Sequence, residues 1–528
     1  MNKTTILRLA AAAGAIVATT AMADWAQWGG NNTKNMVSDV TGLPEEMHAG
    51  EGKTLEEITA SAKGLKWVAK LGSQTYGTPT IGEGWVLAGT NNEDPRNPAI
   101  KGDRGVVMAF DEASGEFKWQ MITPKLGAGK VSDWEFLGMC SSPLIADGKG
   151  YVVTNRGEVI CFDLDGMADG NDGPYKDETT YMSKGLDGAS KEAVVEAGAT
   201  ELDIIWGYDL RSELGVFPHN VTSSSVATDG EKLFVTTSNG VDWSHINIPA
   251  PLAPCLIVLD MKTGELVGEE GSGIGDRIMH CNWSSPGYVD HDGQKTIIFG
   301  AGDGFVYFLD PAAEKDEEGF DILPELYKFD ANKKSYRFDD SGEPIKYATY
   351  DGPNEIIATP VYYDGVVYAA IGQDPEHGEG VGLLSAIKAD SRGEGNADED
   401  AIWTYDGVKR TISSPSVTED YVFLADYSGV LHCVDRKTGE LIWIHDTLSH
   451  IWGSTLVADG KVFLGNEDGE LVVINADKSA DANGDGKVKG DEVLMTVEFP
   501  APIYSSPVAA NGVLYVTTQT HLYAFGKK

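Results

Sequence analysis

A twelve-residue segment near the end of the chain has side chains of the type and spacing that bind calcium. It runs from residue 481 to 492 with the sequence DANGDGKVKGDE. An EF-hand loop takes its oxygen ligands from positions one, three, five, seven and twelve. These positions are held by Asp481, Asn483, Asp485, the carbonyl of Lys487, and Glu492. The segment therefore predicts a structural calcium ion, and the alternative is an acidic turn without metal.

A second acidic loop follows Cys161 and reads DLDGMADGNDG. Its acidic residues are Asp163, Asp165, Asp169 and Asp172. Because no acid falls at the twelfth place, the register fits an EF-hand poorly. Calcium binding and a plain solvated loop both stay open for this segment.

Several histidines and one cysteine are candidates for a metal site. They are His219, His245, His280, His377 and Cys281. No pair of them has a standard zinc spacing, and neighbours in a strand point to opposite faces. The five cysteines form no C-x-x-C, no haem-attachment motif and no adjacent pair, and no nucleophile elbow indicates a hydrolase. A metal site therefore stays an open alternative here.

A repeated unit positions these residues. Each unit opens on a Ser/Thr-rich step and continues as a β-rich segment, an Asp-Gly or Asn-Gly turn, and a second β-rich segment. The eight openings are Thr78-Pro79, Ser142-Pro143, Ser224-Ser225, Ser285-Pro286, Thr359-Pro360, Ser414-Pro415, Ser454-Thr455 and Ser506-Pro507. A third β segment ends in a turn of the T-G-E kind, shown fully by CVDRKTGELIW at 433–443.

The spacing of the units predicts a closed ring. A hydrophobic residue stands twelve positions before four of the openings: Trp67, Trp403, Trp443 and Met495. This spacing places an outer strand directly before each innermost strand. The last unit ends at Phe525 without a fourth strand, whereas a spare strand around Trp67 precedes the first unit. We therefore predict an all-β fold, a single eight-bladed β-propeller of four-stranded antiparallel blades closed by an N-terminal strand. Two smaller propellers are the alternative.

One face of such a propeller is expected to carry the function. The loops that enter the first strand and join the second to the third lie on the same face. Positions five and three places before each opening proline should point toward the channel mouth, and the longest loops share that face. The predicted funnel residues are Tyr76, His219, Asn220, His280, Cys281, Trp283, Glu355, Asp374, His377, Arg410, His450, Trp452 and Tyr504. They suit a planar or sugar-like ligand; the alternative is that they only fill the channel. No catalytic residue is assigned.

The D-x-x-T-G-E-x-x-W turns, the S-S-P openings and the W-x-x-W-G sequence at 25–29 resemble those of pyrroloquinoline-quinone (PQQ) repeat β-propellers. That superfamily includes the quinoprotein alcohol dehydrogenases and the propeller subunit of the outer-membrane assembly machinery. The resemblance covers nearly all of the chain after residue 23. It implies the propeller fold and leaves the function open.

The resemblance to the quinoprotein dehydrogenases implies a PQQ cofactor in the funnel. There the cofactor stacks on a tryptophan and a disulfide of adjacent cysteines, beside a Ca²⁺ and an aspartate base. In this chain Trp283 or Trp452 would stack, and Asn220, Glu355 and Arg410 would contact the anionic cofactor. The adjacent cysteines and a haem motif are missing from the sequence. These departures leave PQQ as an alternative cofactor beside the predicted calcium.

The first residues and the overall charge bear on location and partners. Basic residues and an apolar run from Leu9 precede an A-x-A step that ends at Ala23, which is typical of a cleaved signal peptide. We therefore expect a periplasmic or secreted protein. The formal net charge of −40 argues against nucleic acid and anionic lipid as partners. We expect a monomer without membrane insertion, whose partner is a small molecule or an envelope protein.

The predicted organisation is a signal peptide at 1–23, a lead-in at 24–63 and the propeller at 64–528. Insertions are expected at 163–203, 239–254 and 311–355, beside the EF-hand-like loop at 481–492. Three functions stay open. The first is binding of a ligand or partner at the funnel, with structural calcium. The second is PQQ-dependent oxidation of an alcohol or sugar. The third is a scaffold for assembly of envelope proteins.

Overall fold

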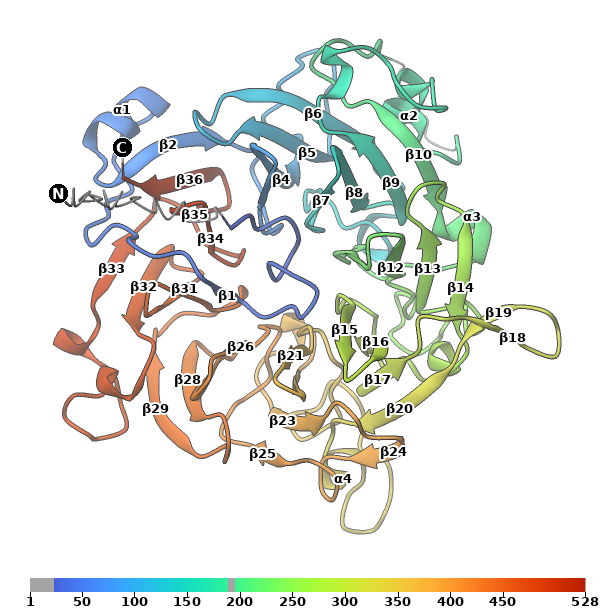
Figure 1. The fold of residues 1–528 in the computed structure, drawn as a ribbon, viewed down its shortest axis with the longest axis vertical. Coiled ribbons are helices and arrows are strands. Elements are labelled where there is room, and N and C mark those ends of the chain that lie inside the picture. The colour runs from blue at the N-terminus through green and yellow to red at the C-terminus, as the bar shows by residue number, and fades with distance from the viewer. Residues whose placement is uncertain (1–22, 189–194, 528) are drawn as a thin grey trace, which may run out of the picture.

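Eight four-stranded antiparallel sheets surround a central channel in the computed structural model (Figure 1). It describes residues 23–188 and 195–527, so the predicted signal peptide lies outside the described residues except for Ala23. The single eight-bladed propeller predicted from the repeat is confirmed, and the alternative of two smaller propellers is wrong. Among the described residues, no helix is long and apolar enough to span a bilayer.

The blades follow one another along the chain, each from its inner to its outer strand. The first blade consists of β3 (Thr80–Gly82), β4 (Trp85–Asn91), β5 (Arg104–Asp111) and β6 (Phe117–Pro124), and the second of β7 (Leu144–Ala146), β8 (Lys149–Val153), β9 (Glu158–Asp163) and β10 (Ile204–Asp209). The third blade consists of β11 (Ala227–Thr228), β12 (Lys232–Thr236), β13 (Leu256–Asp260) and β14 (Leu266–Glu270), and the fourth of β15 (Gly287–His291), β16 (Gln294–Gly300), β17 (Phe305–Leu309) and β20 (Glu325–Asp330). The fifth blade consists of β21 (Val361–Tyr363), β22 (Val366–Ile371), β23 (Leu383–Lys388) and β25 (Trp403–Tyr405), and the sixth of β26 (Ser416–Val417), β27 (Tyr421–Ala425), β28 (Val430–Asp435) and β29 (Leu441–Asp446). The seventh blade consists of β30 (Leu456–Ala458), β31 (Lys461–Gly465), β32 (Glu470–Asn475) and β33 (Met495–Glu498), and the eighth of β34 (Val508–Ala510), β35 (Val513–Thr517), β36 (His521–Gly526) and β2 (Leu65–Lys70).

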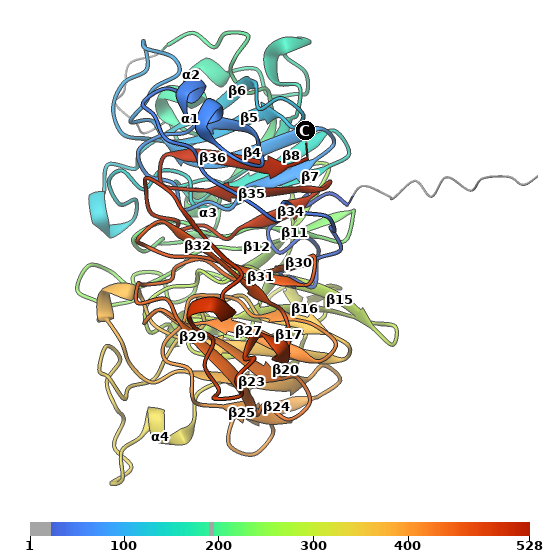
Figure 2. The same cartoon turned by 90° about the vertical axis from the view of Figure 1, so that its left-hand side faces the viewer.

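The remaining strands and α-helices are short additions to this ring. They are β1 (Val37–Ser38), β18 (Glu314–Lys315), β19 (Asp321–Leu323), β24 (Gly393–Asn396), α1 (Leu55–Ser61), α2 (Glu178–Lys184), α3 (Leu210–Leu214) and α4 (Lys334–Arg337). Residues 163–203 join β9 to β10, and residues 239–254 join β12 to β13. Residues 311–355 contain β20, which is the outer strand of the fourth blade, together with α4. The side view in Figure 2 shows α4 projecting from one face and the β15–β16 turn from the other.

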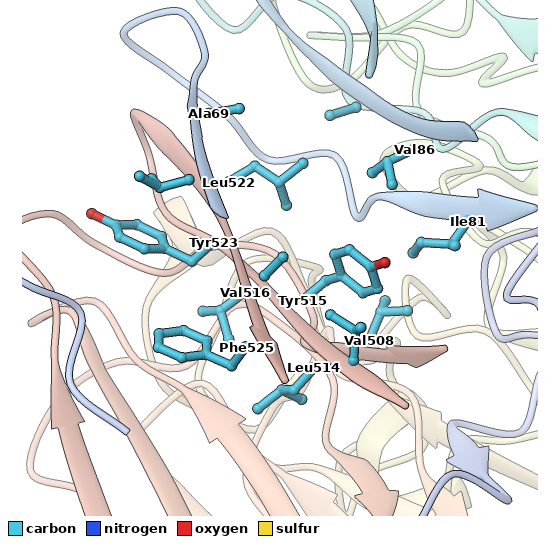
Figure 3. Close-up of a cluster of buried hydrophobic side chains, with 14 of the residues drawn as sticks. Ala69, Ile81, Val86, Val508, Leu514, Tyr515, Val516, Leu522, Tyr523 and Phe525 are labelled. Atoms are coloured by element: carbon cyan, nitrogen blue, oxygen red, sulfur yellow. The ribbon is translucent and has the colours of Figure 1, made fainter. Parts of the chain in front are cut away.

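The ring is closed by the strand that precedes the first blade. Strand β2 pairs antiparallel with β36, and Trp67 stands opposite Ala524. Buried side chains from both ends of the chain meet at this junction, including Ala69 and Ile81 from the start and Tyr515 and Phe525 from the end (Figure 3). Because β36 thereby gains an outer partner, the last blade presents no unpaired edge there.

Tryptophans of several outer strands contact the next blade. The Trp67 indole donates from Nε1 to the Glu112 carbonyl at 2.9 Å, and Trp403 donates in the same way to Arg436 at 2.9 Å. The turn glycine of the neighbouring blade lies under each ring, and a Cβ on Gly115 would come within 2.4 Å of Trp67. This packing explains why glycine stands in the T-G-E-like turns, where Gly115 also has a φ of +70°.

The hydroxyl residues that open each unit form a ring of hydrogen bonds between blades. In seven steps the backbone N–H of one opening residue donates to the hydroxyl of the next blade's opening residue; the acceptors are Ser225, Ser285, Thr359, Ser414, Ser454, Ser506 and Thr78. The eighth step uses the Ser142 hydroxyl, which donates to the Thr78 carbonyl at 2.7 Å. The Ser/Thr of the repeat therefore joins every blade to its neighbours around the channel.

The lead-in crosses the end of the channel opposite the funnel mouth. It hydrogen-bonds to the inner strand of every blade, at Ile81, Ile145, Thr228, Tyr288, Tyr362, Val417, Val457 and Ala509. Lys34 is fully buried in this segment, and its ammonium group donates to the Gln27 side-chain oxygen at 2.7 Å. The lead-in therefore closes one end of the propeller and holds all eight blades together.

Candidate functional site

The central channel encloses a cavity of about 550 Å³ that opens on one face. Its base is lined by the eight opening residues, Thr78, Ser142, Ser225, Ser285, Thr359, Ser414, Ser454 and Ser506, together with Trp28 from the lead-in. Large aromatic side chains form much of the wall: Tyr76, Trp134, Trp283, Trp452 and Tyr504. The cavity is therefore a funnel with a hydroxyl-lined base and aromatic sides, a shape that suits a small ligand.

The aromatic wall is held by contacts among its own members. Tyr76 and Tyr504 stack with ring centroids 4.7 Å apart, and Trp452 meets them edge-on at 5.9 and 5.5 Å. On the other side, the Trp283 indole donates to the Val221 carbonyl at 2.9 Å. Paired aromatic rings prefer such stacked and edge-to-face arrangements, so these contacts fix the positions of the wall residues.

The charges on the funnel wall are negative. The ionisable carboxyl groups that line the cavity belong to Glu135, Asp374 and Glu376. No Lys, Arg or His is among the described residues of the lining. Burial raises the pKa of Asp374. A wall of this composition favours an uncharged or positively charged ligand over an anion.

Six of the thirteen predicted funnel residues line the cavity: Tyr76, Asn220, Trp283, Asp374, Trp452 and Tyr504. The other seven lie outside its lining: His219, His280, Cys281, Glu355, His377, Arg410 and His450. Counted back from the second residue of each opening, nearly all residues three places before it line the cavity. Most residues five places before it do not. These entry segments are irregular, and Asn220 has a positive φ of 54°, so a period of two does not describe them.

Glu355 and Arg410 are buried behind the wall and already have partners. Glu355 accepts hydrogen bonds from the Cys281 N–H at 3.0 Å and from the Tyr347 hydroxyl at 2.9 Å. Burial raises its pKa to about 8. The Arg410 guanidinium donates to the carbonyls of His377 and Thr349. Arg410 therefore fixes neighbouring loops and does not present its charge to the funnel.

Two further predicted residues serve local packing. The His450 ring stacks on Tyr427 with centroids 4.4 Å apart and lies 3.2 Å from a Glu467 carboxylate oxygen. The Cys281 thiol contacts the Ser238 carbonyl at 3.2 Å, and all five cysteines are free. Next to these, His219, His245, His280 and His377 gather at one place behind Trp283, with ring centroids of neighbouring pairs 4.4–6.2 Å apart.

Several residues of the site escaped the sequence argument. Trp28 reaches the cavity from the lead-in, and Trp134 reaches it from the loop between the first and second blades. Tyr347 packs against His280 and His377 from the segment that follows α4. None of these segments belongs to the repeated unit, so counting from the opening prolines does not find them. The aromatic lead-in motif was the one signal for Trp28.

The EF-hand-like loop folds back on itself. Asp481 accepts hydrogen bonds from the backbone N–H groups of Gly484 and Gly486, and Glu492 accepts one from the N–H of Asn483 at 3.2 Å. The middle of the loop pairs with β29 of the sixth blade at Ile444. The first and last carboxylates of the motif thus both accept hydrogen bonds from the backbone of the loop. The loop connects β32 to β33 and lies on the face opposite the funnel mouth. In the second acidic loop, carboxylate oxygens of Asp163, Asp165 and Asp169 lie within 4.8 Å of one another.

The funnel residues do not fit PQQ. This quinone carries three carboxylates, and the only charged groups of the described lining are acidic. Arg410, the cation that the resemblance proposes for the cofactor, points into loops behind the wall. The free cysteines also provide no disulfide to stack under a quinone.

Comparisons with known proteins agree with the fold. A family model described as "Outer membrane protein assembly factor BamB" matches residues 392–482. A protein of that description from Shewanella oneidensis is 35% identical over 68 residues, which is 13% of this chain and 17% of the relative. The match thus spans less than a fifth of that relative's length.

Solved structures extend the likeness to most of the chain. BamB from Moraxella catarrhalis has a TM-score of 0.50 and 12% identity, and the match covers 88% of this chain and 97% of that chain. The quinohemoprotein alcohol dehydrogenase from Comamonas testosteroni has a TM-score of 0.47 and 13% identity, with 96% of this chain and 81% of that chain covered. At these identities the likeness concerns the fold alone. The predicted resemblance of this chain to the PQQ-repeat β-propellers is therefore confirmed.

Proposed function

We propose that the chain is an exported, soluble propeller that binds a small uncharged or positively charged organic ligand in its funnel. The observation that carries this proposal is the composition of the 550 Å³ cavity, with aromatic sides, a hydroxyl base and acidic groups at the wall. Aromatic faces bind the apolar faces of sugars and the charge of organic cations, while hydroxyls orient polar groups. The signal-like first residues and the net charge of −40 support export.

Tryptophan fluorescence tests the ligand class. The probes are methyl glucoside and glucuronate, which differ mainly by a carboxylate, and choline as an organic cation. We expect a saturable change with methyl glucoside or choline, and at least a tenfold weaker response with glucuronate because the wall is acidic. Trp452→Ala should weaken the binding about tenfold, by loss of one aromatic contact worth about 1 kcal/mol or more.

The matched control for that variant is Trp243→Ala, because Trp243 is 58% exposed and does not line the cavity. It should bind as the parent protein does. The proposal is wrong if none of the probes binds saturably, if glucuronate binds best, or if both tryptophan variants lose the same affinity.

A second candidate is a scaffold for envelope proteins, favoured by the match of residues 392–482 to the outer-membrane assembly factor family. That match includes the outer strand of the fifth blade, the whole sixth blade and much of the seventh. Copurification of an outer-membrane assembly protein, lost when exposed residues of these blades are changed, would support the scaffold. The dehydrogenase alternative predicts a bound-quinone absorption band after addition of PQQ and Ca²⁺; the acidic lining leads us to expect none.

The same proposal includes a structural calcium ion in the loop 481–492. The register of its five ligand positions supports the ion, as does the fold of the loop around Asp481 and Glu492. We expect Ca²⁺ to raise the melting temperature of the parent protein and Glu492→Ala to abolish that rise, because a bound ion stabilises only the folded state. Calorimetry with Ca²⁺ and with a chelator measures both effects.

The control is Glu498→Ala, since Glu498 is an exposed residue of β33 just beyond the loop. This variant should keep the calcium-dependent rise. An equal melting temperature of the parent protein in Ca²⁺ and in chelator would contradict the assignment.

A further inference from the structure

Four of the ten histidines of the chain converge on one point beside the funnel. His219 and His245 come from the third blade, His280 from the entry to the fourth, and His377 from the β22–β23 loop of the fifth. Ring nitrogens of His219, His245 and His280 lie within 4.8 Å of one another. The His377 ring centroid is 5.3 Å from that of His280.

The backbone around these residues is well fixed. Residues 238–241 lie between two of the histidine segments: the His219 N–H donates to the Ser238 carbonyl, and the Val241 N–H donates to the His280 carbonyl. His245 stands on a turn held by Asp242, which accepts a hydrogen bond from Asn247 at 3.0 Å. Backbone hydrogen bonds therefore fix these chain segments relative to one another. The positions of the imidazoles follow from the fold and do not depend on a single flexible loop.

The imidazole nitrogens are available as ligands. His219 is fully buried, and its Nδ1 lies 2.6 Å from the Val241 carbonyl, which places the proton on Nδ1 and leaves the Nε2 lone pair free. Nε2 of His219, both ring nitrogens of His280 and Nδ1 of His377 have no hydrogen-bond partner among the described residues. A buried polar atom left without a partner costs about 1–3 kcal/mol, so four such atoms in one cluster need an explanation.

Carboxyl groups stand behind the imidazoles. A Glu355 oxygen lies 3.5 Å from Nδ1 of His280, and the Tyr347 hydroxyl holds that same oxygen at 2.9 Å. A carboxylate on the distal nitrogen of a histidine ligand orients the ring and makes it more basic. Asp374, which attracts a charge on His280, adds a second acidic group next to the cluster.

We propose that His219, His245 and His280, with His377 beside them, form a binding site for a transition-metal ion of the copper or zinc class. Nitrogen ligands select these ions over Ca²⁺ and Mg²⁺, which prefer oxygen. Bonds of about 2.0–2.1 Å place tetrahedral ligands about 3.3 Å apart. Since the three ring nitrogens lie within 4.8 Å of one another, the rings need to close in by no more than about 1.5 Å. His245 is exposed and gives the ion a route from solvent. The site does not depend on the funnel ligand, from which Trp283 separates it.

Copper binding tests the site directly. The purified protein is stripped with a chelator, returned to buffer with excess Ca²⁺ to fill the acidic loops, and titrated with Cu²⁺. We expect one tightly bound Cu²⁺ per chain, with nitrogen hyperfine lines from several imidazoles in its electron paramagnetic resonance spectrum. Zn²⁺ should compete for this site only in large excess, because Cu²⁺ binds nitrogen ligands more tightly, and Ca²⁺ should not displace the ion at all.

Two variants make the test specific. His245→Ala changes an exposed residue and should leave the melting temperature without metal unchanged, while it weakens copper binding at least tenfold. His48→Ala is the control, because His48 is exposed in the lead-in far along the chain from the cluster. Absence of nitrogen hyperfine lines, displacement of the ion by Ca²⁺, or equal affinity in the His245 and His48 variants would overturn the proposal.

Discussion

Trp67→Ala is expected to destabilise the whole propeller by about 3–5 kcal/mol, the usual cost of replacing a buried tryptophan with alanine. Trp67 is 6% exposed, packs with its ring centroid 5.9 Å from that of Tyr515, and donates to the Glu112 carbonyl. The variant therefore leaves a cavity over Gly115 and an unpaired carbonyl in the first blade. Denaturant unfolding followed by circular dichroism measures the loss.

The matched control is Trp403→Ala, which removes the same kind of contact between the fifth and sixth blades. Trp403 also donates to a turn carbonyl at 2.9 Å and covers a glycine of the next blade, Gly439. Its strand, however, is covalently continuous with its own blade, whereas β2 joins the last blade through hydrogen bonds to β36. Only Trp67→Ala should therefore speed amide hydrogen exchange across β36. Equal exchange in both variants would contradict the role of this junction in closing the ring.

Ring closure could be predicted because it depends on a pattern that the sequence repeats. The number of residues from Trp67 to the second residue of the opening that follows it is the same as for Trp403, Trp443 and Met495. This equal spacing indicates that an outer strand precedes each inner strand. The strand around Trp67 precedes the first blade, so it was expected to pair with the last sheet. The structure places Trp67 opposite Ala524 in that sheet. The same count did not reveal β20, because the fourth blade lacks a tryptophan-bearing turn and its outer strand is inside residues 311–355.

The funnel was only partly predictable, for a reason that lies in the backbone. Tyr76 and Trp452, each three places before the second residue of an opening, lie next to the hydroxyl ring, so their direction follows from the inner strand. Two residues further out the chain leaves regular β geometry. Arg410 turns into the neighbouring loops, and Cys281 turns toward Ser238. Side-chain direction there depends on tertiary contacts that no periodicity encodes.

The histidine cluster shows the same limit. His219 and His280 belong to equivalent entry segments of adjacent blades, so their proximity follows from the repeat. His245 and His377 come from two long loops of different length and sequence. Their approach to the first two depends on the Asp242 turn and on Arg410, which holds the His377 carbonyl at 3.2 Å. A metal site assembled from several loops therefore has no spacing signature in the sequence.

Lys34 gives a prediction of similar size for the lead-in, which is the other element that joins all blades. Its ammonium group is fully buried with only neutral oxygen partners, from Gln27, Trp28 and Val226. Burial lowers the pKa of Lys34 from 10.5 to about 7. Between pH 7 and 10.5 the unfolded chain therefore binds more protons at this group than the folded chain does.

The sign of the pH effect follows from that difference. Stability rises with pH wherever the unfolded state binds more protons, so this lysine destabilises the fold by up to about 5 kcal/mol at or below pH 7 and by nothing above pH 10.5. In Lys34→Met the titration is absent. We expect the free energy of unfolding of Lys34→Met, minus that of the parent protein, to fall by several kcal/mol between pH 7 and pH 10.

The pH dependence, and not the absolute stability, tests the argument. Lys34→Met also leaves the Gln27 side-chain oxygen without its donor, which shifts the difference by a constant at every pH. Lys63→Met is the control, because the Lys63 side chain is 69% exposed in the same lead-in, and its difference from the parent should be flat. A flat difference for Lys34→Met as well would mean that Lys34 keeps its proton through this range in the folded protein. Protonation of Lys34 would then not make the packing of the lead-in depend on pH. The contacts between the lead-in and the eight inner strands would contribute the same stability in neutral and alkaline solution.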